Sequence, residues 1–455
     1  MNAKIYDRAS LLFISELLEN KDYAELRNLL LDTEPYDLAL LFEKCTKNEL
    51  AIIFRLLPKE LAAEVFIEMD SDMQEELISS FSDIELAEML DELYVDDTVD
   101  IIEEMPANVV KRIIRNTDQE RRRFINEILK YPKDSAGSIM TIEYVRLEKR
   151  LTVSEAFKRI RRIGLDRETI YTCYVTEPDK TLIGLVTVKD LLLSEEDSII
   201  EDIMNRNVIY VNTHDDREHV ANVMNKYDFL AIPVVDHEKR LVGIVTIDDA
   251  MDVLREETTE DIQKMAAITP TDKPYLKTSV FQIWYKRIPW LMLLMVSATF
   301  TGKIIGAFEH SLSKMVILTA FIPMLMDTGG NAGGQASVTI IRGLSLGEIS
   351  MGNILRILWK ECRVALMCGV SLAVVGFAKI IIIDKAEITT AIVVCITIAI
   401  TVVIAKLVGS ALPIIAKRIG FDPAVMAHPF ITTIVDAISL LVYFGIAAAV
   451  IPELK

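Results

Sequence analysis

Five long apolar stretches in the second half of the chain restrict its fold more than any other feature of the sequence. They occupy residues 288–308, 316–342, 361–383, 389–413 and 427–451. Each is long enough to cross about 30 Å of hydrocarbon as a helix that rises about 1.5 Å per residue. Residues 288–455 are therefore expected to form a transmembrane domain of five α-helices.

The second stretch carries polar residues that hydrocarbon penalises. Asp327, Asn331 and Gln335 are spaced four apart, so they form one stripe on a helix. A single Asp at the centre of a membrane helix costs about 3 kcal/mol. Gly330 and Gly334 run beside the stripe and allow close approach of another helix or a hydrated ion. The stripe is interpreted as the lining of a conduction path.

A purely structural interpretation of the same stretch is the alternative. Its small residues would then serve only helix packing, and Asp327 would be paired with a basic residue. The nearest bases at bilayer depth are Lys303 and Lys406. Both lie closer to the ends of their spans, which favours the conduction path.

The last apolar stretch supplies a second set of oxygen ligands. Thr432, Asp436 and Ser439 share one helix face, and Asp422 lies in a turn expected near the membrane boundary. Carboxylate, hydroxyl and amide oxygens are hard ligands, so Mg²⁺, Ca²⁺ or Mn²⁺ fits them better than copper or zinc. Acids on two different helices favour a path for a hydrated cation.

The first 283 residues differ sharply from the rest in charge. Residues 284–455 carry 14 Lys+Arg and 9 Asp+Glu, which leaves 35 and 58 for residues 1–283. This acidic balance argues against a nucleic acid partner and suits a surface that meets cations. Within it, residues 1–132 show apolar residues at every third or fourth position, which predicts an all-α superhelical N domain.

Residues 133–257 contain an internal repeat. LIGLVTVKDLLL at 182–193 matches LVGIVTIDDAMDV at 241–253, and short β-branched runs alternate with helical patterns in both copies. The copies, 133–198 and 199–257, resemble a tandem pair of α/β CBS domains. The resemblance implies an adenosine nucleotide, such as ATP, bound by the Thr-x-x-Asp of each copy: Thr187, Asp190, Thr246 and Asp249. Capping of the following helices by the same residues is an alternative of equal weight.

A polar connector, residues 258–287, is expected to form a connecting helix before the first span. Basic residues precede that span and also fall between the second and third spans and between the fourth and fifth. The positive-inside rule then places the N-terminal domains in the cytoplasm and the C-terminus outside. The chain is thus expected to be a multi-pass protein of the inner or plasma membrane.

Acidic residues continue past the second repeat at helical spacing. An i, i+4 ladder and its neighbouring face hold seven of them: Asp248, Asp252, Glu256, Glu260, Asp249, Glu257 and Asp261. Asp96, Asp97 and Asp100 form a second cluster in the N domain. Mg²⁺ bridging the clusters would cancel their repulsion, so they are interpreted as an intracellular cation sensor. Solvated surface and helix capping are the alternatives.

Three motifs behind the two repeats resemble those of the MgtE family of magnesium channels and transporters. They are PMLMDTGGNAGGQ at 323–335, GFDPAV at 420–425 and PFITTIVD at 429–436. The resemblance covers nearly the whole chain. It implies a homodimer with the pore along the subunit interface, Asp436 helping to hold hydrated Mg²⁺, and closure at high internal Mg²⁺.

The leading function is therefore a passive, gated Mg²⁺ channel, with Mg²⁺, membrane lipid and a second copy of the chain as partners. Enzymatic activity is not expected, since the sequence has no GxxxxGK[ST] phosphate-binding motif. Two alternatives are an exchanger that couples Mg²⁺ to Na⁺ or H⁺ and a divalent-metal channel of broader selectivity. A third, a receptor whose spans are only anchors, disagrees with the acids at Asp327 and Asp436.

Overall fold

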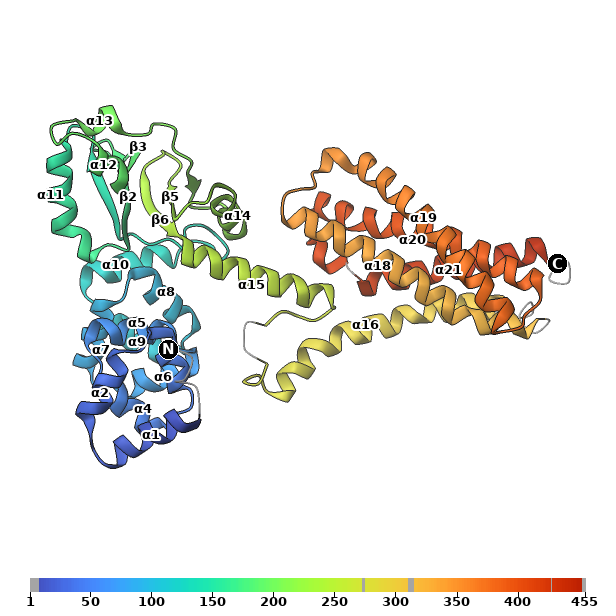
Figure 1. The fold of residues 1–455 in the computed structure, drawn as a ribbon, viewed down its shortest axis with the longest axis horizontal. Coiled ribbons are helices and arrows are strands. Elements are labelled where there is room, and N and C mark those ends of the chain that lie inside the picture. The colour runs from blue at the N-terminus through green and yellow to red at the C-terminus, as the bar shows by residue number, and fades with distance from the viewer. Residues whose placement is uncertain (1–7, 272–274, 310–314, 427, 452–455) are drawn as a thin grey trace. The chain divides into compact units, whose positions relative to one another are not determined.

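The computed structural model describes residues 8–271, 275–309, 315–426 and 428–451 (Figure 1). The chain divides after Leu254 into two compact units, residues 1–254 and 255–455. Helix α15, Ile247–Met265, contains the division. The units are described in turn.

The first unit begins with an all-α region, as the periodicity predicts. Among the residues described, 8–128 form ten helices of eight to twelve residues. These are α1 Arg8–Glu19, α2 Tyr23–Leu31, α3 Pro35–Phe42, α4 Lys47–Phe54, α5 Lys59–Ile67, α6 Ser71–Ser80, α7 Asp83–Glu92, α8 Val95–Glu104, α9 Ala107–Asn116 and α10 Gln119–Ile128. Polar side chains cap the starts of α2, α4, α6, α7 and α10. At α7, Ser82 N–H donates to Glu85 Oε2 at 2.7 Å and Glu85 N–H donates to Ser82 Oγ at 3.2 Å.

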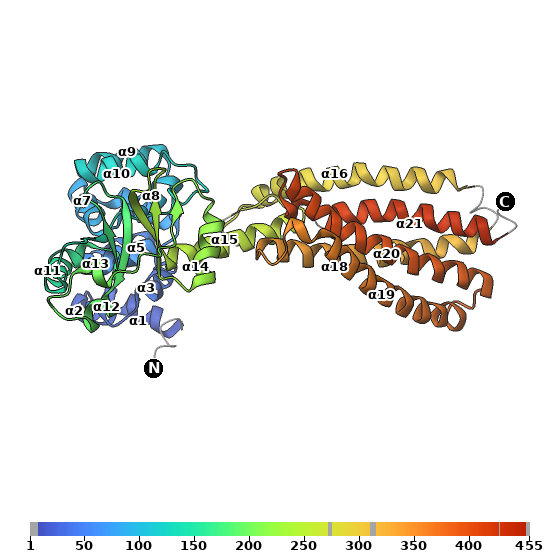
Figure 2. The ribbon, with the colours of Figure 1, turned by 90° about the horizontal axis from the view of Figure 1, so that it is seen from above.

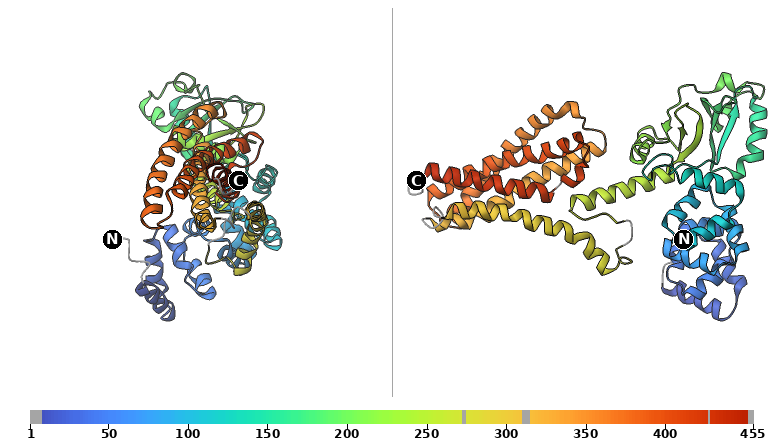
Figure 3. Two further views of the ribbon diagram at one scale, coloured as in Figure 1. Left: turned by 90° about the vertical axis from the view of Figure 1, so that its right-hand side faces the viewer. Right: turned by 180° about the vertical axis from the view of Figure 1, so that it is seen from behind.

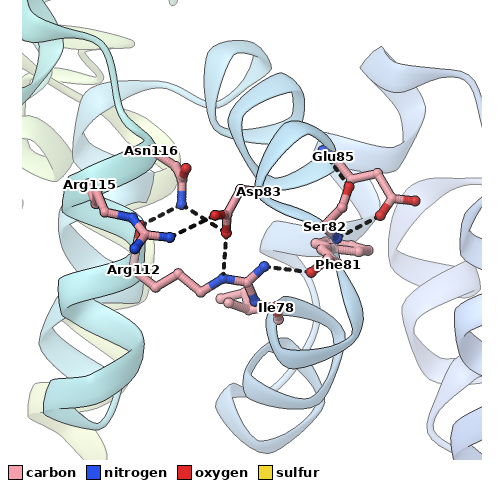
Figure 4. A network of polar contacts seen from close by, with 8 residues as sticks. All are labelled: Ile78, Phe81, Ser82, Asp83, Glu85, Arg112, Arg115 and Asn116. Atoms are coloured by element: carbon pink, nitrogen blue, oxygen red, sulfur yellow. Dashed lines mark hydrogen bonds and ion pairs between the residues drawn. The ribbon is translucent and has the colours of Figure 1, made fainter.

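Arg112 of α9 joins that helix to the end of α6 and to the start of α7 (Figure 4). Arg112 of α9 donates to the backbone carbonyl oxygens of Ile78 and Phe81 at the end of α6. Its Nε also donates to Asp83 Oδ1 at 3.1 Å, and Arg115 pairs with Asp83 Oδ2 at 2.6 Å. The last carbonyls of a helix have no partner within that helix, so Arg112 satisfies acceptors that would otherwise be open.

Two three-stranded sheets follow, one for each sequence repeat. The first contains β1 Tyr144–Glu148, β2 Thr169–Thr176 and β3 Leu182–Thr187, and the second contains β4 Val211–Asn212, β5 Ala231–Val235 and β6 Leu241–Thr246. In both sheets the first strand is parallel to the second, and the second is antiparallel to the third. Helices α11 Val153–Ile163, α12 Val188–Leu193, α13 Ile200–Ile203 and α14 Arg217–Tyr227 complete the pair. The shared strand order confirms the internal repeat.

The second unit is helical. Its long helices are α16 Val280–Ala307, α18 Ile322–Ser345, α19 Ile354–Ile382, α20 Ile388–Arg418 and α21 His428–Val450. Short 3₁₀ helices, η2 Val316–Phe321, η3 Met351–Asn353 and η4 Pro423–Met426, lie between them. Helix α18 packs against α20 and α21, and α19 packs against α20. Figures 2 and 3 show these helices running side by side.

Four helices of the described residues are long and apolar enough to cross a membrane. They are α16, α19, α20 and residues 429–450 of α21. The remaining predicted span, 316–342, begins as η2 and continues as the 24-residue helix α18. The polar residues of α18 keep its hydropathy lower than that of the other four.

The connector is not the single helix expected over 258–287. Helix α15 begins at Ile247, within the second repeat, and ends at Met265. Ala267 has a φ of +55°, a left-handed conformation that ends a helix, and Pro270 follows. The next helix, α16, begins only at Val280. The turn chemistry at Ala267 and Pro270 thus breaks the predicted helix into two.

Candidate ion pathway and cytosolic sensor

Helix α18 exposes a single face. The exposed residues on this helix are Pro323, Asp327, Asn331, Gln335, Val338, Thr339 and Arg342. At 100° per residue they all fall within one half of the helix. The side-chain amide of Asn331 donates to Asp327 Oδ1 at 3.0 Å. The predicted stripe therefore lies together on the surface of this single chain, and Thr339 and Arg342 extend it beyond what the sequence singled out.

Helix α21 brings a second carboxylate to this region. Asp436 is half-buried, and its carboxylate lies near enough to that of Asp327 for the two charges to interact. Thr432, one turn earlier, packs on α18, where a Cβ added to Gly330 would lie 2.9 Å from the Thr432 methyl carbon. The Ser439 hydroxyl instead donates to the carbonyl of Val435 at 2.6 Å within its own helix.

Gly329 and Gly333 of α18 lie on the face opposite the stripe and pack against other helices. A Cβ on Gly329 would lie 2.8 Å from the methyl carbon of Thr401, and one on Gly333 would lie 3.1 Å from the carbonyl oxygen of Ala405. Such close approach is typical of small residues in membrane helix pairs. Helix packing and the polar stripe thus coexist on α18, because they use different faces of it.

The basic partners proposed for Asp327 do not reach it. Among the residues described, no ion pair joins Asp327 to Lys303 or Lys406. Lys406 is itself buried on α20. Asp327 accepts a side-chain hydrogen bond from Asn331, and no base among the described residues of the same chain neutralises its negative charge.

Asp422 lies apart from the other predicted pore residues. Its Oδ1 accepts from the backbone N–H of Ala424 at 2.8 Å, and its Oδ2 pairs with Lys264 at 2.6 Å. Lys264 also pairs with Glu260 at 2.6 Å. Burial alone would lower the pKa of Lys264, but the hydrogen bonds that it donates to Asp422 and Glu260 raise it above its usual value. The side chain of His428 lies outside the described residues.

In the first unit, the N-domain acids meet those at the start of α15. Asp96 is 7% exposed, and its Oδ1 has no hydrogen-bond partner. Burial, followed by the charge of Asp249, raises the pKa of Asp96 well above its usual range. Burial also raises the pKa of Asp97 to about 6 and that of Asp249 to about 7, with the charge of Asp248 adding to both. Burial, followed by the charge of Asp249, also raises the pKa of Asp100, one turn later on α8, to about 8.

Two glutamates that the sequence did not single out belong to the same group. Glu143 is 8% exposed and accepts from the Thr141 hydroxyl at 2.8 Å. Glu168 has a buried Oε2 without a partner, and burial, followed by the charges of Asp97 and Asp248, raises its pKa to about 8. Neither belongs to an acidic ladder or to a motif. Only the tertiary fold brings them to the N-domain acids.

The donor set of this carboxylate group fits a hydrated divalent cation. No three carboxylate, histidine or cysteine side chains among the described residues form a cage for direct coordination of a metal. Mg²⁺, however, usually keeps several waters and binds through one or two carboxylates. The unpartnered oxygens of Asp96 and Glu168 are acceptors that such waters would satisfy.

The remaining predicted residues have local roles in the structure. The Thr187 hydroxyl donates to Asp190 at 2.6 Å in a capping box at α12, and the Thr246 hydroxyl donates to Asp249 at 2.6 Å at the start of α15. Helix capping is thus present, and a nucleotide role stays a prediction. The rest of the acidic ladder lies on α15: Asp252, Glu256, Glu257 and Asp261.

Comparisons with known families match most of the chain. The MgtE intracellular N domain matches residues 33–134, the CBS domain matches residues 136–196 and 200–256, and MgtE, described as a divalent cation transporter, matches residues 322–446.

Curated relatives match over nearly the full length. The magnesium transporter MgtE of Thermus thermophilus is 34% identical, over 95% of this chain and 97% of its own length. That of Bacillus subtilis is 32% identical over 99% of both. Among solved structures, the cytosolic domain of the Mg²⁺ channel MgtE in complex with ATP is 36% identical, with a TM-score of 0.51, over 53% of this chain and 99% of that one.

Proposed function

This chain belongs to the MgtE family of magnesium transporters, and on that premise we propose that it is a Mg²⁺-selective channel that takes up Mg²⁺ down its electrochemical gradient. The observation that carries the proposal is the exposed face of α18. Asp327, Asn331 and Gln335 lie on the surface of a helix packed among apolar membrane helices. Lipid would leave these groups without partners, so water or another protein chain covers them.

A second copy of the chain is the cover that we propose. Two such faces opposed in a homodimer enclose Asp327 and Asp436 of both chains, together with Thr432, Asn331 and Gln335. Carboxylate, amide and hydroxyl oxygens are the ligands that a hard cation prefers. Because Mg²⁺ gives up water reluctantly, these groups hold its hydration shell rather than the bare ion.

Flux measurements on Asp436 test the pore. Asp436→Asn in proteoliposomes is expected to abolish Mg²⁺ uptake, since it removes one negative charge per chain from the path. Ile434→Ala is the matched control, because Ile434 lies on the same helix and is 37% exposed. Normal uptake by Asp436→Asn with normal membrane insertion would remove Asp436 from the selectivity role.

The same preparation separates a channel from an exchanger. A channel gives single-channel currents far above transporter turnover and no fixed counterflow of Na⁺ or H⁺. Currents that require such counterflow would support the exchanger instead. Competition by Mn²⁺, Co²⁺, Ni²⁺ or Ca²⁺ at equal concentration would indicate the broader divalent-metal channel.

We further propose that internal Mg²⁺ closes the channel by neutralising the carboxylate group of the first unit. Burial of Asp96 beside Asp249 is unfavourable while both are charged, and a divalent cation removes that cost. Without Mg²⁺ the N domain separates from the CBS pair. Because α15 begins in the CBS pair and its last residue, Met265, packs against Ile341 of α18, its movement carries the change to the pore. The N-terminal domains then lie in the cytoplasm, and the C-terminus lies outside.

The sensor is tested on the acidic ladder. Neutralising Asp248, Asp252 and Glu256 together is expected to weaken closure by internal Mg²⁺ in patch recordings, while conduction persists. Glu260 is left unchanged in this variant because it pairs with Lys264. An unchanged Mg²⁺ dependence would exclude the ladder as the sensor.

A nucleotide at the CBS pair is the remaining proposal. The cytosolic domain of a relative has been solved with ATP, and Thr187, Asp190, Thr246 and Asp249 stand at corresponding places of the two repeats. Saturable ATP binding to the purified chain, lost in Thr187→Val, is the expected result. Retained binding in that variant would place the nucleotide elsewhere.

A further inference from the structure

A lysine near the end of α15 lies between two carboxylates. One belongs to α15 itself, and the other belongs to the segment that joins α20 to α21, which is called the linker here. Lys264 Nζ is 2.6 Å from Glu260 Oε1 and 2.6 Å from Asp422 Oδ2. The side chain of Lys264 is only 23% exposed, and those of Glu260 and Asp422 are each 34% exposed. All three residues belong to the second unit.

Neighbouring contacts fix both sides of this ion-pair group. Met265, the last residue of α15, packs against Ile341 of α18 and Ala424 of η4. On the linker, Asp422 also accepts from the backbone of Ala424, and Gly420 has a φ of +81°, a conformation that favours glycine. Contacts and backbone conformation within the linker thus determine its shape. The end of α15 binds the linker through one apolar contact, Met265 with Ala424, and one ion pair, Lys264 with Asp422.

We propose that Lys264 is a built-in cation that joins α15 to the linker before α21 without any need for Mg²⁺. Its ammonium lies between the carboxylates of Glu260 and Asp422 and offsets the repulsion between them. The first unit shows the contrasting case, because Asp96 and Glu168 there have buried oxygens with no partner. The contact between the N domain and the CBS pair is therefore sensitive to divalent cations, whereas the contact between α15 and the linker, called the joint below, is constitutive. Lys264 is a positioning residue that keeps the linker attached to α15 in both the open and the closed state of the channel.

Charge arithmetic gives this proposal a sharp consequence. Lys264→Gln leaves Glu260 and Asp422 facing each other without a cation, which opens the joint. A free Mg²⁺ then takes the place of the ammonium, so the variant joint depends on Mg²⁺ where the native joint does not. A partly buried pair of this kind changes the opening equilibrium by about two- to fivefold.

Proteolysis of the full-length purified protein tests the joint directly. A glutamate-specific protease reports the opening of α15 near Glu260. Cleavage there is expected to be about threefold faster in Lys264→Gln than in the native chain when EDTA is present, and Mg²⁺ should slow it only in the variant. Lys264→Arg, which keeps the charge, should behave like the native chain. The proposal is overturned if EDTA alone brings the native rate up to that of Lys264→Gln.

A second measurement links the joint to gating and so rests on the proposed function. Lys264→Gln should shift the internal Mg²⁺ concentration for half-closure about threefold in patches, and the exchanged pair Lys264→Asp with Asp422→Lys should restore it. An exchanged pair whose shift equals the sum of the single variants overturns the role in gating. The proteolysis experiment does not depend on channel activity. It would therefore still test the contact between α15 and the linker if the proposed gating were wrong.

Discussion

Gly333 of α18 and Gly409 of α20 bring the two helices into backbone contact, since a methyl group on Gly409 would collide with the carbonyl oxygen of Gly333. Apolar side chains gain little free energy when they move from lipid into a contact between helices, so close packing supplies much of the attraction between membrane helices. This contact determines how deeply α18 sits against α20. It thereby fixes which face of α18, the one that carries Asp327, remains uncovered.

Gly409→Ala is expected to destabilise the membrane domain by about 1–3 kcal/mol, because the added methyl group forces the two backbones apart. Thermal unfolding in detergent measures the loss as a lower midpoint. Gly445→Ala on α21 is the matched control, since a Cβ there meets nothing within 4 Å. Equal midpoints for the two variants would contradict the backbone contact.

Asn331→Ala is expected to reduce Mg²⁺ uptake by about fivefold, because Asp327 loses the amide that holds its carboxylate in place. Uptake into proteoliposomes followed with a Mg²⁺-sensitive dye is the measurement. Val370→Ala, at an exposed apolar position of α19, serves as the control. An undiminished rate for Asn331→Ala would mean that the amide of Asn331 has no part in the path.

Arg112→Ala should destabilise the N-domain stack by about 1–3 kcal/mol, since it opens two carbonyl acceptors at the end of α6. Arg115→Ala removes only an exposed ion pair with Asp83 and should cost less than about 1 kcal/mol. Hydrogen exchange of peptides from α6 and α9 measures both losses locally. Similar exchange in the two variants would show that the carbonyl bonds of Arg112 add nothing.

The pH dependence of the first unit follows from its raised pKa values. Protonated carboxylates are favoured in the closed arrangement, so their stabilising contribution is complete near pH 4 and is lost as pH rises through about 6 for Asp97, 7 for Asp249 and 8 for Glu168. Small-angle scattering of the full chain in EDTA should therefore show expansion between about pH 6 and 8.

Saturating Mg²⁺ should suppress this expansion, because the cation then neutralises the same groups. Asp96→Asn with Asp249→Asn should also reduce it, since fewer charges meet in that variant. A radius that is constant over this range without Mg²⁺ would contradict the assignment.

Patterns with a short period were sufficient to predict much of this structure. The matching segments of the internal repeat predicted the two sheets, because each copy folds in the same way. The i, i+4 spacing of Asp327 and Asn331 predicted the polar stripe, because it depends only on neighbouring turns of one helix. The stripe did not predict which helix covers the opposite face of α18. That depends on the Gly333–Gly409 contact between residues 76 positions apart.

Features that depend on contacts between distant elements could not be predicted from the sequence. Glu143 and Glu168 carry no helical periodicity, so their place beside Asp97 appears only once the N domain and the CBS pair are folded together. Asp422 matched a family motif, but its partner, Lys264, lies more than 150 residues earlier in the chain. The helix breaks at Ala267 because this residue has a left-handed backbone conformation, which an alanine in a sequence does not predict.

The low hydropathy of α18 bears on how the protein reaches its final form during synthesis. A nascent segment is retained in the bilayer according to its own apolar content, and this one competes poorly with the four segments around it. Stable integration of residues 322–345 then has to await the emergence of α20, more than 40 residues later. The order of translation thus makes the most polar helix settle later than α19, which follows it in the chain, and truncation before α20 should release α18 to the aqueous side.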